Sequence, residues 1–311
     1  MYAPDQTVES HSDPFAHVRT CAHNGVLRRN GAAIEKHEGL TKGRHVNKAI
    51  FAKCLILIAC GGWSAAGDVF GQDHPFGPDF PKLDSDATGS WWEQAKPRLM
   101  VPRDQVVAFA VYAHDRGTLK LSAQFYPLLP DEPREAVLEF QRDGQWHAAA
   151  RREVQYPGWS AHFRIESWDN TQDVPYRVRH AGGSQFTGRI RRDPIDKDVI
   201  VVGSLSCNSS RTPGPRPRII ENLKLQDPDL LFFAGDQSYH HKQHTFGWLE
   251  FGVQFRDVLR DRPVIAIPDD HDVGQANIWG EGGKQAATPA GPSGGFYYPA
   301  SYVNMVQRCQ T

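Results

Sequence analysis

Between residues 196 and 311, short apolar runs rich in β-branched residues alternate with segments of helical periodicity, and this alternation constrains the fold most. It predicts strands at 198–203, 230–234 and 264–267, and helices at 217–225 and 246–259. The second helix carries Trp248, Phe251, Phe255 and Leu259 at helical spacing, which gives it one apolar face. Because strands that alternate with helices pair in parallel through crossovers, we predict an α/β domain over 196–311.

Polar residues of the kinds that bind metals follow each of the three predicted strands. The first strand runs into Ser206-Cys207-Asn208, the second into Gly235-Asp236-Gln237-Ser238-Tyr239, and the third into Asp269-Asp270-His271-Asp272. Ligands of open α/β sheets bind outside the carboxyl ends of the strands, so the three clusters should share one rim. Singly, each residue has a plainer explanation, since a free Cys is most often a small buried hydrophobe. Their shared position favours a binding site.

These three motifs, taken in order, resemble the calcineurin-like metallophosphoesterases, and most closely their alkaline phosphatase D (PhoD-like) branch. The common superfamily pattern is Asp-x-His, then Gly-Asp, then Gly-Asn-His-Asp/Glu. Here Ser206-Cys207 stands at the first motif, Tyr239 follows Gly235-Asp236, and Asp269-Asp270-His271-Asp272 replaces the third. The resemblance covers about residues 100–311. It implies the α+β four-layer fold of metallophosphoesterases, incomplete in this chain.

The resemblance also implies a dinuclear metal site and a role for each residue. Cys207 would bind one metal as a thiolate beside the Tyr239 phenolate, Asp236 would bridge both metals, and Asp270 would bind the second. His271 would contact the phosphate or protonate the leaving oxygen. The implied metals are Fe(III) and Ca²⁺, with other divalent cations open. The implied reaction is hydrolysis of a phosphate ester by metal-bound hydroxide, as in an alkaline phosphatase or phosphodiesterase.

The chemistry of the residues supports these assignments independently. Thiolate suits a transition metal, and carboxylate oxygens suit a hard cation. Two cations bridged by a carboxylate can clamp the attacking and leaving oxygens of an in-line displacement. Asn208 is a further candidate for contact with the phosphate. No position of the family requires the run of His240, His241 and His244, which we interpret as residues behind the site or on the surface.

Residues 98–192 show a different pattern, in which short apolar runs are separated by Gly, Pro, Asp and Asn. Strands are predicted at 106–112, 119–126, 136–141, 161–167, 175–180 and 185–190. Six or seven short strands at this spacing predict an all-β sandwich of immunoglobulin or fibronectin type ahead of the α/β domain. No cluster of ligand-type residues stands out in it, so its expected role is structural or substrate-orienting.

The N-terminal part of the sequence has features that indicate export from the cytoplasm. Residues 1–47 are polar and lack hydrophobic periodicity, so we expect them to be disordered or a mis-annotated gene start. Residues 48–67 resemble a signal peptide, with a basic flank, the apolar run 54–60 and a plausible cleavage after Ala66. Residues 57–60 also resemble a bacterial lipobox, in which Cys60 would carry a lipid anchor. A buried helix is the alternative. The predicted location is secreted, periplasmic or cell-surface, with no transmembrane helix once the signal is removed.

The motifs missing near residue 311 and the net charge of the chain lead to the remaining predictions, on completeness, alternative function and partners. The resemblance implies later histidine motifs that nothing after Asp272 supplies, so we expect a C-terminally truncated protein with an apolar sheet face left open. A truncated, non-catalytic surface protein that binds through its β-sandwich is therefore the alternative function. Lys and Arg number 35 against 36 Asp and Glu, which gives no reason to expect nucleic acid as a partner. The substrate class and oligomeric state stay open, a sulfate ester or phosphotriester included.

Overall fold

The computed structural model describes residues 23–28, 99–209, 214–241, 243–278, 280, 284–289 and 294–310 of the chain. The predicted signal segment 48–67, with Cys60, lies outside these residues, and so does most of the segment 1–47. Export, lipidation and the mis-annotated start therefore stay predictions. None of the described helices combines the length and the apolar character needed to cross a membrane.

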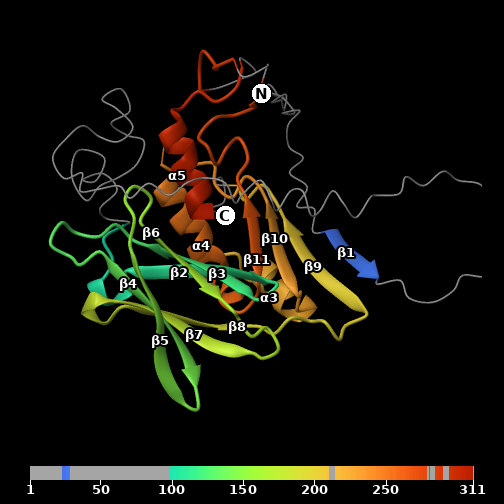
Figure 1. Cartoon of the computed structure of the whole chain (residues 1–311). Helices are drawn as coiled ribbons and strands as arrows, with labels where there is room; N and C mark the ends of the chain where they lie inside the picture. Colours follow the sequence, from blue (N-terminus) through green and yellow to red (C-terminus); the bar gives the residue numbers. More distant parts are fainter. Residues whose placement is uncertain are drawn as a thin grey trace, which may run out of the picture. The chain divides into compact units, whose positions relative to one another are not determined.

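Two antiparallel sheets occupy the first part of the described chain (Figure 1). One has the order β2-β3-β6 and consists of β2 (Val107–Asp115), β3 (Thr118–Phe125) and β6 (Ser160–Glu166). The other has the order β5-β4-β7-β8 and consists of β4 (Glu135–Arg142), β5 (Gln145–Glu153), β7 (Val174–His180) and β8 (Gln185–Ile190). The six predicted strands are confirmed, and an immunoglobulin-like sandwich stays a prediction.

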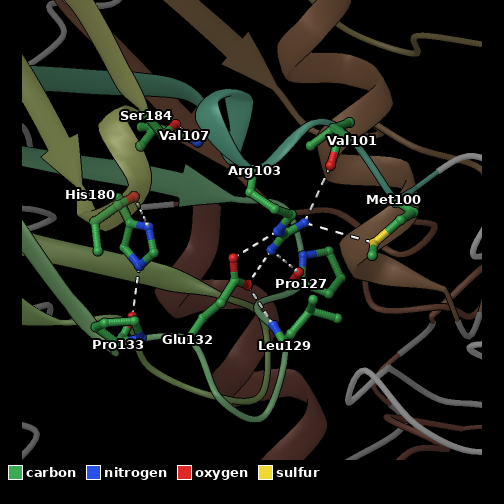
Figure 2. A network of polar contacts seen from close by, with 11 residues as sticks. Met100, Val101, Arg103, Val107, Pro127, Leu129, Glu132, Pro133, His180 and Ser184 are labelled. Carbon is green, nitrogen blue, oxygen red and sulfur yellow. Dashed lines mark hydrogen bonds and ion pairs between the residues drawn. The ribbon is translucent and has the colours of Figure 1, made fainter.

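A polar network ties the start of β2 to the loop between β3 and β4 (Figure 2). Arg103, in the short 3₁₀ helix η1 (Arg103–Gln105), forms an ion pair with Glu132 and donates to the Pro127 carbonyl at 3.2 Å. Just after the 3₁₀ helix η2 (Ala181–Gly183), the Ser184 hydroxyl accepts a hydrogen bond from the Val107 amide at 3.0 Å. These contacts bring both antiparallel sheets together at this end.

A mixed sheet with the order β1-β9-β10-β11 follows (Figure 1). Strands β9 (Val199–Leu205), β10 (Leu230–Ala234) and β11 (Val264–Ile267) are parallel, and they alternate with helices α3 (Pro217–Gln226) and α4 (His244–Leu259). The predicted strand and helix order is thus confirmed. A further helix, α5 (Ala300–Gln310), was not predicted from the sequence.

Strand β1 (His23–Arg28) lies in the segment that we expected to be disordered. It pairs antiparallel with β9, and His23 stands opposite Ser204. At these six residues the structure differs from the prediction. The physical reason is the edge of β9, whose backbone donors and acceptors can recruit a strand of little intrinsic hydrophobicity.

One face of the parallel strands is apolar but only partly covered. Register places Phe232 beside Ile265 and Ala234 beside Ile267 on this face. Ile265 and Ile267 are 43% and 45% exposed, whereas Val264 and Ala266, on the opposite face, are buried. Among the described residues, these two isoleucines leave apolar surface exposed on this face, and the truncation from which we expected an open face stays a prediction.

Helix α4 packs aromatic residues against β2 on one side and β10 on the other. The Trp248 ring meets Phe109 of β2 edge-on, with 5.4 Å between centroids. The Phe251 ring meets Phe233 of β10 at 4.8 Å, and Phe255 meets Phe233 at 5.4 Å. This confirms the predicted apolar face of the helix, which joins the antiparallel and parallel sheets through one core.

Gly252 of α4 allows the close approach of this helix to Phe109. A Cβ at this position would lie 1.9 Å from the nearest atom of the Phe109 ring, which is 1% exposed and has no room to move. Gly252→Ala gains up to about 1 kcal/mol of helix propensity but overpacks the core, which costs about 1–3 kcal/mol. We expect urea unfolding to show a net loss of roughly 1–2 kcal/mol. The neighbouring, 39% exposed Val253→Ala serves as control; equal stabilities of the two variants would contradict this packing.

Candidate metal centre

The ends of β9 and β10 meet at one rim, as their parallel direction requires. Beyond the last ladder pair, the Cys207 amide donates to the Gly235 carbonyl at 3.2 Å, and the Asn208 amide donates to the Asp236 carbonyl at 2.8 Å. The two loops therefore run side by side past the ends of their strands. This pairing brings the Cys207 and Asp236 side chains, 29 residues apart in sequence, into contact.

Both loops hold their functional residues in an uncommon backbone conformation. Cys207 has φ 58° and Asp236 has φ 56°, which is the left-handed region that costs non-glycine residues about 1–2 kcal/mol each. Gly235, at φ 88°, brings the second loop against the third, since a Cβ there would lie 2.4 Å from Cβ of Asp269. Strain of this kind clusters at functional sites, where the surrounding structure enforces it.

Asp236 stands at the centre of the cluster and is 7% exposed. Its Oδ2 accepts a hydrogen bond from the Tyr239 hydroxyl at 2.9 Å and lies 3.6 Å from Sγ of Cys207. Its Oδ1 is buried and has no hydrogen-bond partner among the residues that the structure describes. A buried carboxylate oxygen without a donor is costly, and a cation is one group that can satisfy it.

The third loop brings Asp270 and His271 to the same place. One ligand atom each from Asp236, Asp270 and His271 lie within 4.8 Å of one another. Asp270 is held by backbone donors, since its Oδ1 accepts from the His271 amide at 2.9 Å and its Oδ2 accepts from the Asn277 amide. The rim predicted from the sequence thus gathers all three motifs.

Burial changes the acidity of two of these groups. It raises the pKa of Asp236, and the Tyr239 hydrogen bond opposes that rise only in part. Burial also raises the pKa of Tyr239 well above its ordinary value, and the neighbouring Cys207 and Asp236 raise it further. Without a cation, the phenol therefore keeps its proton and donates a hydrogen bond to Asp236. Ionising the whole set requires a positive charge at the centre.

Asp272 holds the site together from behind. Its Oδ2 accepts from the Asp236 amide at 2.7 Å and from the Asp269 amide at 3.0 Å. Its Oδ1 accepts from the Ser238 amide at 3.1 Å and from the Gln310 side chain at 3.2 Å. Burial raises the pKa of Asp272 to about 7, although these donors lower it. One side chain thus links the second loop, the third loop and α5.

Asn208, the candidate for phosphate contact, has its amide engaged within the protein. Its Nδ2 donates to the Gln237 carbonyl at 3.2 Å and to Oε1 of Gln254 at 2.8 Å. Its Oδ1 accepts from Nε of Arg216 at 3.1 Å. This arrangement fixes the first loop, and contact with a phosphate stays a prediction.

The three histidines after Tyr239 have different environments. His240 contacts Glu250 at 2.8 Å, and His244 is 2% exposed, its pKa lowered to about 3 by burial. His244 is therefore in the core, not on the surface. Nε2 of His241 lies 2.7 Å from Nδ1 of His271, so His241 belongs to the site. No spacing signal could have found this contact, because the two residues are 30 positions apart on different loops.

The donor set fits metal ions. A thiol, a phenol and Oδ2 of Asp236 converge on one side, and a carboxylate oxygen of Asp236 also belongs to the group that includes Asp270 and His271. Soft and phenolic donors suit a transition metal, whereas carboxylates accept harder cations as well. The residues present can therefore hold a cation, with Asp236 common to both sets of donors.

Comparisons with known proteins give weak likenesses only. No protein-family model matches the chain, and no curated protein does. A structure of PhoD is 12% identical with a TM-score of 0.47, over 60% of this chain and 43% of that one. Purple acid phosphatase PPD1 from yellow lupin (Lupinus luteus) seeds is 14% identical with a TM-score of 0.40, over 58% and 37%. This chain thus spans less than half of either phosphatase. Because these likenesses do not show a family, we base the proposed function on the geometry of the site.

Proposed function

We propose that this chain is a metal-dependent phosphoesterase of the PhoD-like type, which acts outside the cytoplasm. The observation that carries the proposal is Asp236, a buried carboxylate with one oxygen facing Cys207 and Tyr239 and the other without a donor in the part of the chain that the structure describes. A carboxylate placed in this way suits the bridging position between two cations. Asp270 and His271 complete the group around it.

Each residue has a defined part in holding the ions. Cys207 and Tyr239 would bind a ferric ion together with Asp236, because thiolate and phenolate favour a transition metal. Asp270 would bind the second ion, for which Ca²⁺ suits the oxygen donors. Bound ions supply Lewis-acid chemistry, since they neutralise charge on the phosphoryl oxygens and activate water.

His271 completes the catalytic set. It stands beside the carboxylates, its ring packs against Tyr239 at 4.2 Å between centroids, and one ring nitrogen contacts His241. A histidine in this place can donate a hydrogen bond to a phosphoryl oxygen and a proton to the leaving alkoxide. The ester oxygen leaves as an alcohol, and phosphate remains at the site until it dissociates.

The full chain should hydrolyse a chromogenic phosphate ester only when loaded with metal. We expect 4-nitrophenyl phosphate to be hydrolysed after incubation with Fe³⁺ and Ca²⁺, a chelator to abolish turnover, and restored metal to restore it. Release of 4-nitrophenolate measures the rate. Hydrolysis that survives complete removal of metal would contradict the proposal, as would no hydrolysis with any cation.

The iron-loaded protein should be coloured. A ferric ion bound by thiolate and phenolate absorbs visible light, so Tyr239→Phe should remove much of the band while iron stays bound through the remaining ligands. Visible spectra and iron analysis of the same samples test this. Tyr156→Phe, in the antiparallel region where Tyr156 packs on Trp159, is the matched control and should keep the band. An active enzyme that is colourless and free of iron would contradict the metal assignment.

A further inference from the structure

The His271 ring is held on its edge and by ring packing. Its Nδ1 lies 2.7 Å from Nε2 of His241, and the two imidazole rings meet edge to edge, with 4.9 Å between centroids and 26° between planes. The Tyr239 ring also packs on His271, with centroids 4.2 Å apart. The ring therefore has one well-defined orientation, to which His241 contributes a hydrogen bond and Tyr239 a ring contact.

In a neutral histidine, a hydrogen bond at one ring nitrogen determines whether the other ring nitrogen can donate or accept. A neutral imidazole has one donor and one acceptor nitrogen. The hydrogen-bond partner of one nitrogen therefore fixes which of the two nitrogens carries the proton. His241 occupies Nδ1 of His271, so Nε2 is the nitrogen left for a ligand. If Nδ1 accepts from His241, then Nε2 must carry the proton and can donate it.

We propose that His241 is a positioning residue, whose Nε2–H donates to Nδ1 of His271 and so keeps the His271 proton on Nε2, facing the phosphoryl or leaving oxygen. This inference rests on the proposed function for its catalytic meaning, but the pairing itself does not. The roles of the two rings differ: His271 touches the substrate, and His241 acts through His271. Residues that orient a catalytic or ligating histidine in this way typically contribute about 10- to 100-fold.

The adjacent His240 provides a matched control. Its Nε2 faces Oε2 of Glu250 at 2.8 Å, and its ring packs edge-on against Phe246 of α4 at 4.8 Å between centroids. It is therefore directed towards α4 and not towards His271. The same substitution at two neighbouring histidines separates the pairing with His271 from a general disturbance of the loop.

Nitrogen NMR of the full chain, labelled with ¹⁵N-histidine and free of substrate, tests the pairing. The His271 signals are identified by their loss in His271→Gln. At a pH where the ring is neutral, we expect a single Nε2–H tautomer in the wild type. His241→Ala should give a mixture of tautomers, whereas His241→Gln, whose amide can still donate, should restore the Nε2–H form, and His240→Gln should change nothing. An Nδ1–H tautomer in the wild type, or an unchanged tautomer in His241→Ala, would overturn the proposal.

Kinetics with two leaving groups test the catalytic consequence. His241→Ala should lower kcat about 10- to 100-fold for an alkyl phosphate, whose alkoxide needs a proton, and much less for 4-nitrophenyl phosphate, with KM unchanged for both. An equal loss for both esters would indicate a merely structural role and overturn the inference. A wild-type protein that hydrolyses neither ester would refute the proposed function instead, and the tautomer measurement then decides the pairing alone.

Discussion

Asp236→Asn should abolish turnover without unfolding the protein. The amide keeps the volume of the carboxyl group but removes its charge and replaces one ligating oxygen with NH₂, so residue 236 can no longer offer an oxygen to both donor sets. We expect hydrolysis of a phosphate ester to fall at least about 10³-fold, equivalent to about 4 kcal/mol of activation free energy. Initial rates at saturating metal measure the effect.

In the metal-free protein, Asp236→Asn should not lower the free energy of unfolding, although it abolishes activity. Burial raises the pKa of Asp236, which shows that the ionised carboxylate is costly at this position without a cation. Metal-free Asp236→Asn should therefore be at least as stable as the wild type in urea. Asp269→Asn is the matched control, because Asp269 is exposed on the same rim and is outside the metal cluster. It should keep most of the activity; full activity in Asp236→Asn would refute the site.

Asp272→Ala should cause the largest loss of stability. The substitution leaves three backbone amides and the Gln310 amide without their acceptor in a place where the side chain is 3% exposed. Unsatisfied buried donors cost about 1–3 kcal/mol each, and partial relaxation reduces the sum, so we expect a loss of about 3–5 kcal/mol. Metal binding should be lost with it, because the amide of Asp236 is one of the four donors.

Urea unfolding at neutral pH measures this loss. Asp272→Asn keeps the volume and one oxygen acceptor, so its loss should be smaller. Asp257→Ala is the control, since Asp257 is exposed on α4 and forms a surface ion pair with Lys224 at 3.3 Å. Exposed pairs contribute at most about 1 kcal/mol. If Asp272→Ala and Asp257→Ala unfold at the same urea concentration, Asp272 does not hold the rim together.

The position of the candidate metal site at the carboxyl ends of the parallel strands could be predicted, because local sequence patterns determine where these strands end. Buried parallel strands are continuous apolar runs, and their carboxyl ends share one edge, so strand ends alone bring Cys207, Asp236 and Asp270 together. The aromatic spacing of α4 likewise predicted the face that packs between β2 and β10. These features depend on period and direction, which a single sequence shows.

Other features depend on contacts that no period encodes. The Asp272 carboxylate binds amides and a side chain from residues up to 38 positions away, and His241 meets His271 across two loops. Strand β5 escaped prediction because its side chains are mostly exposed and lack apolar alternation. Helix α5 had a usable signal, since its buried Tyr302, Val306 and Cys309 recur at helical spacing.

Anomalous diffraction from crystals of the full chain grown with Fe³⁺ and Ca²⁺ tests the central claim most directly. Data collected on both sides of the iron absorption edge locate iron independently of any assumption about activity. The account predicts an iron peak within about 2.5 Å of an Asp236 oxygen, beside Cys207 Sγ and the Tyr239 hydroxyl, with a second ion next to Asp270. Crystals that bind iron elsewhere, or that show no anomalous density at Asp236, would contradict it.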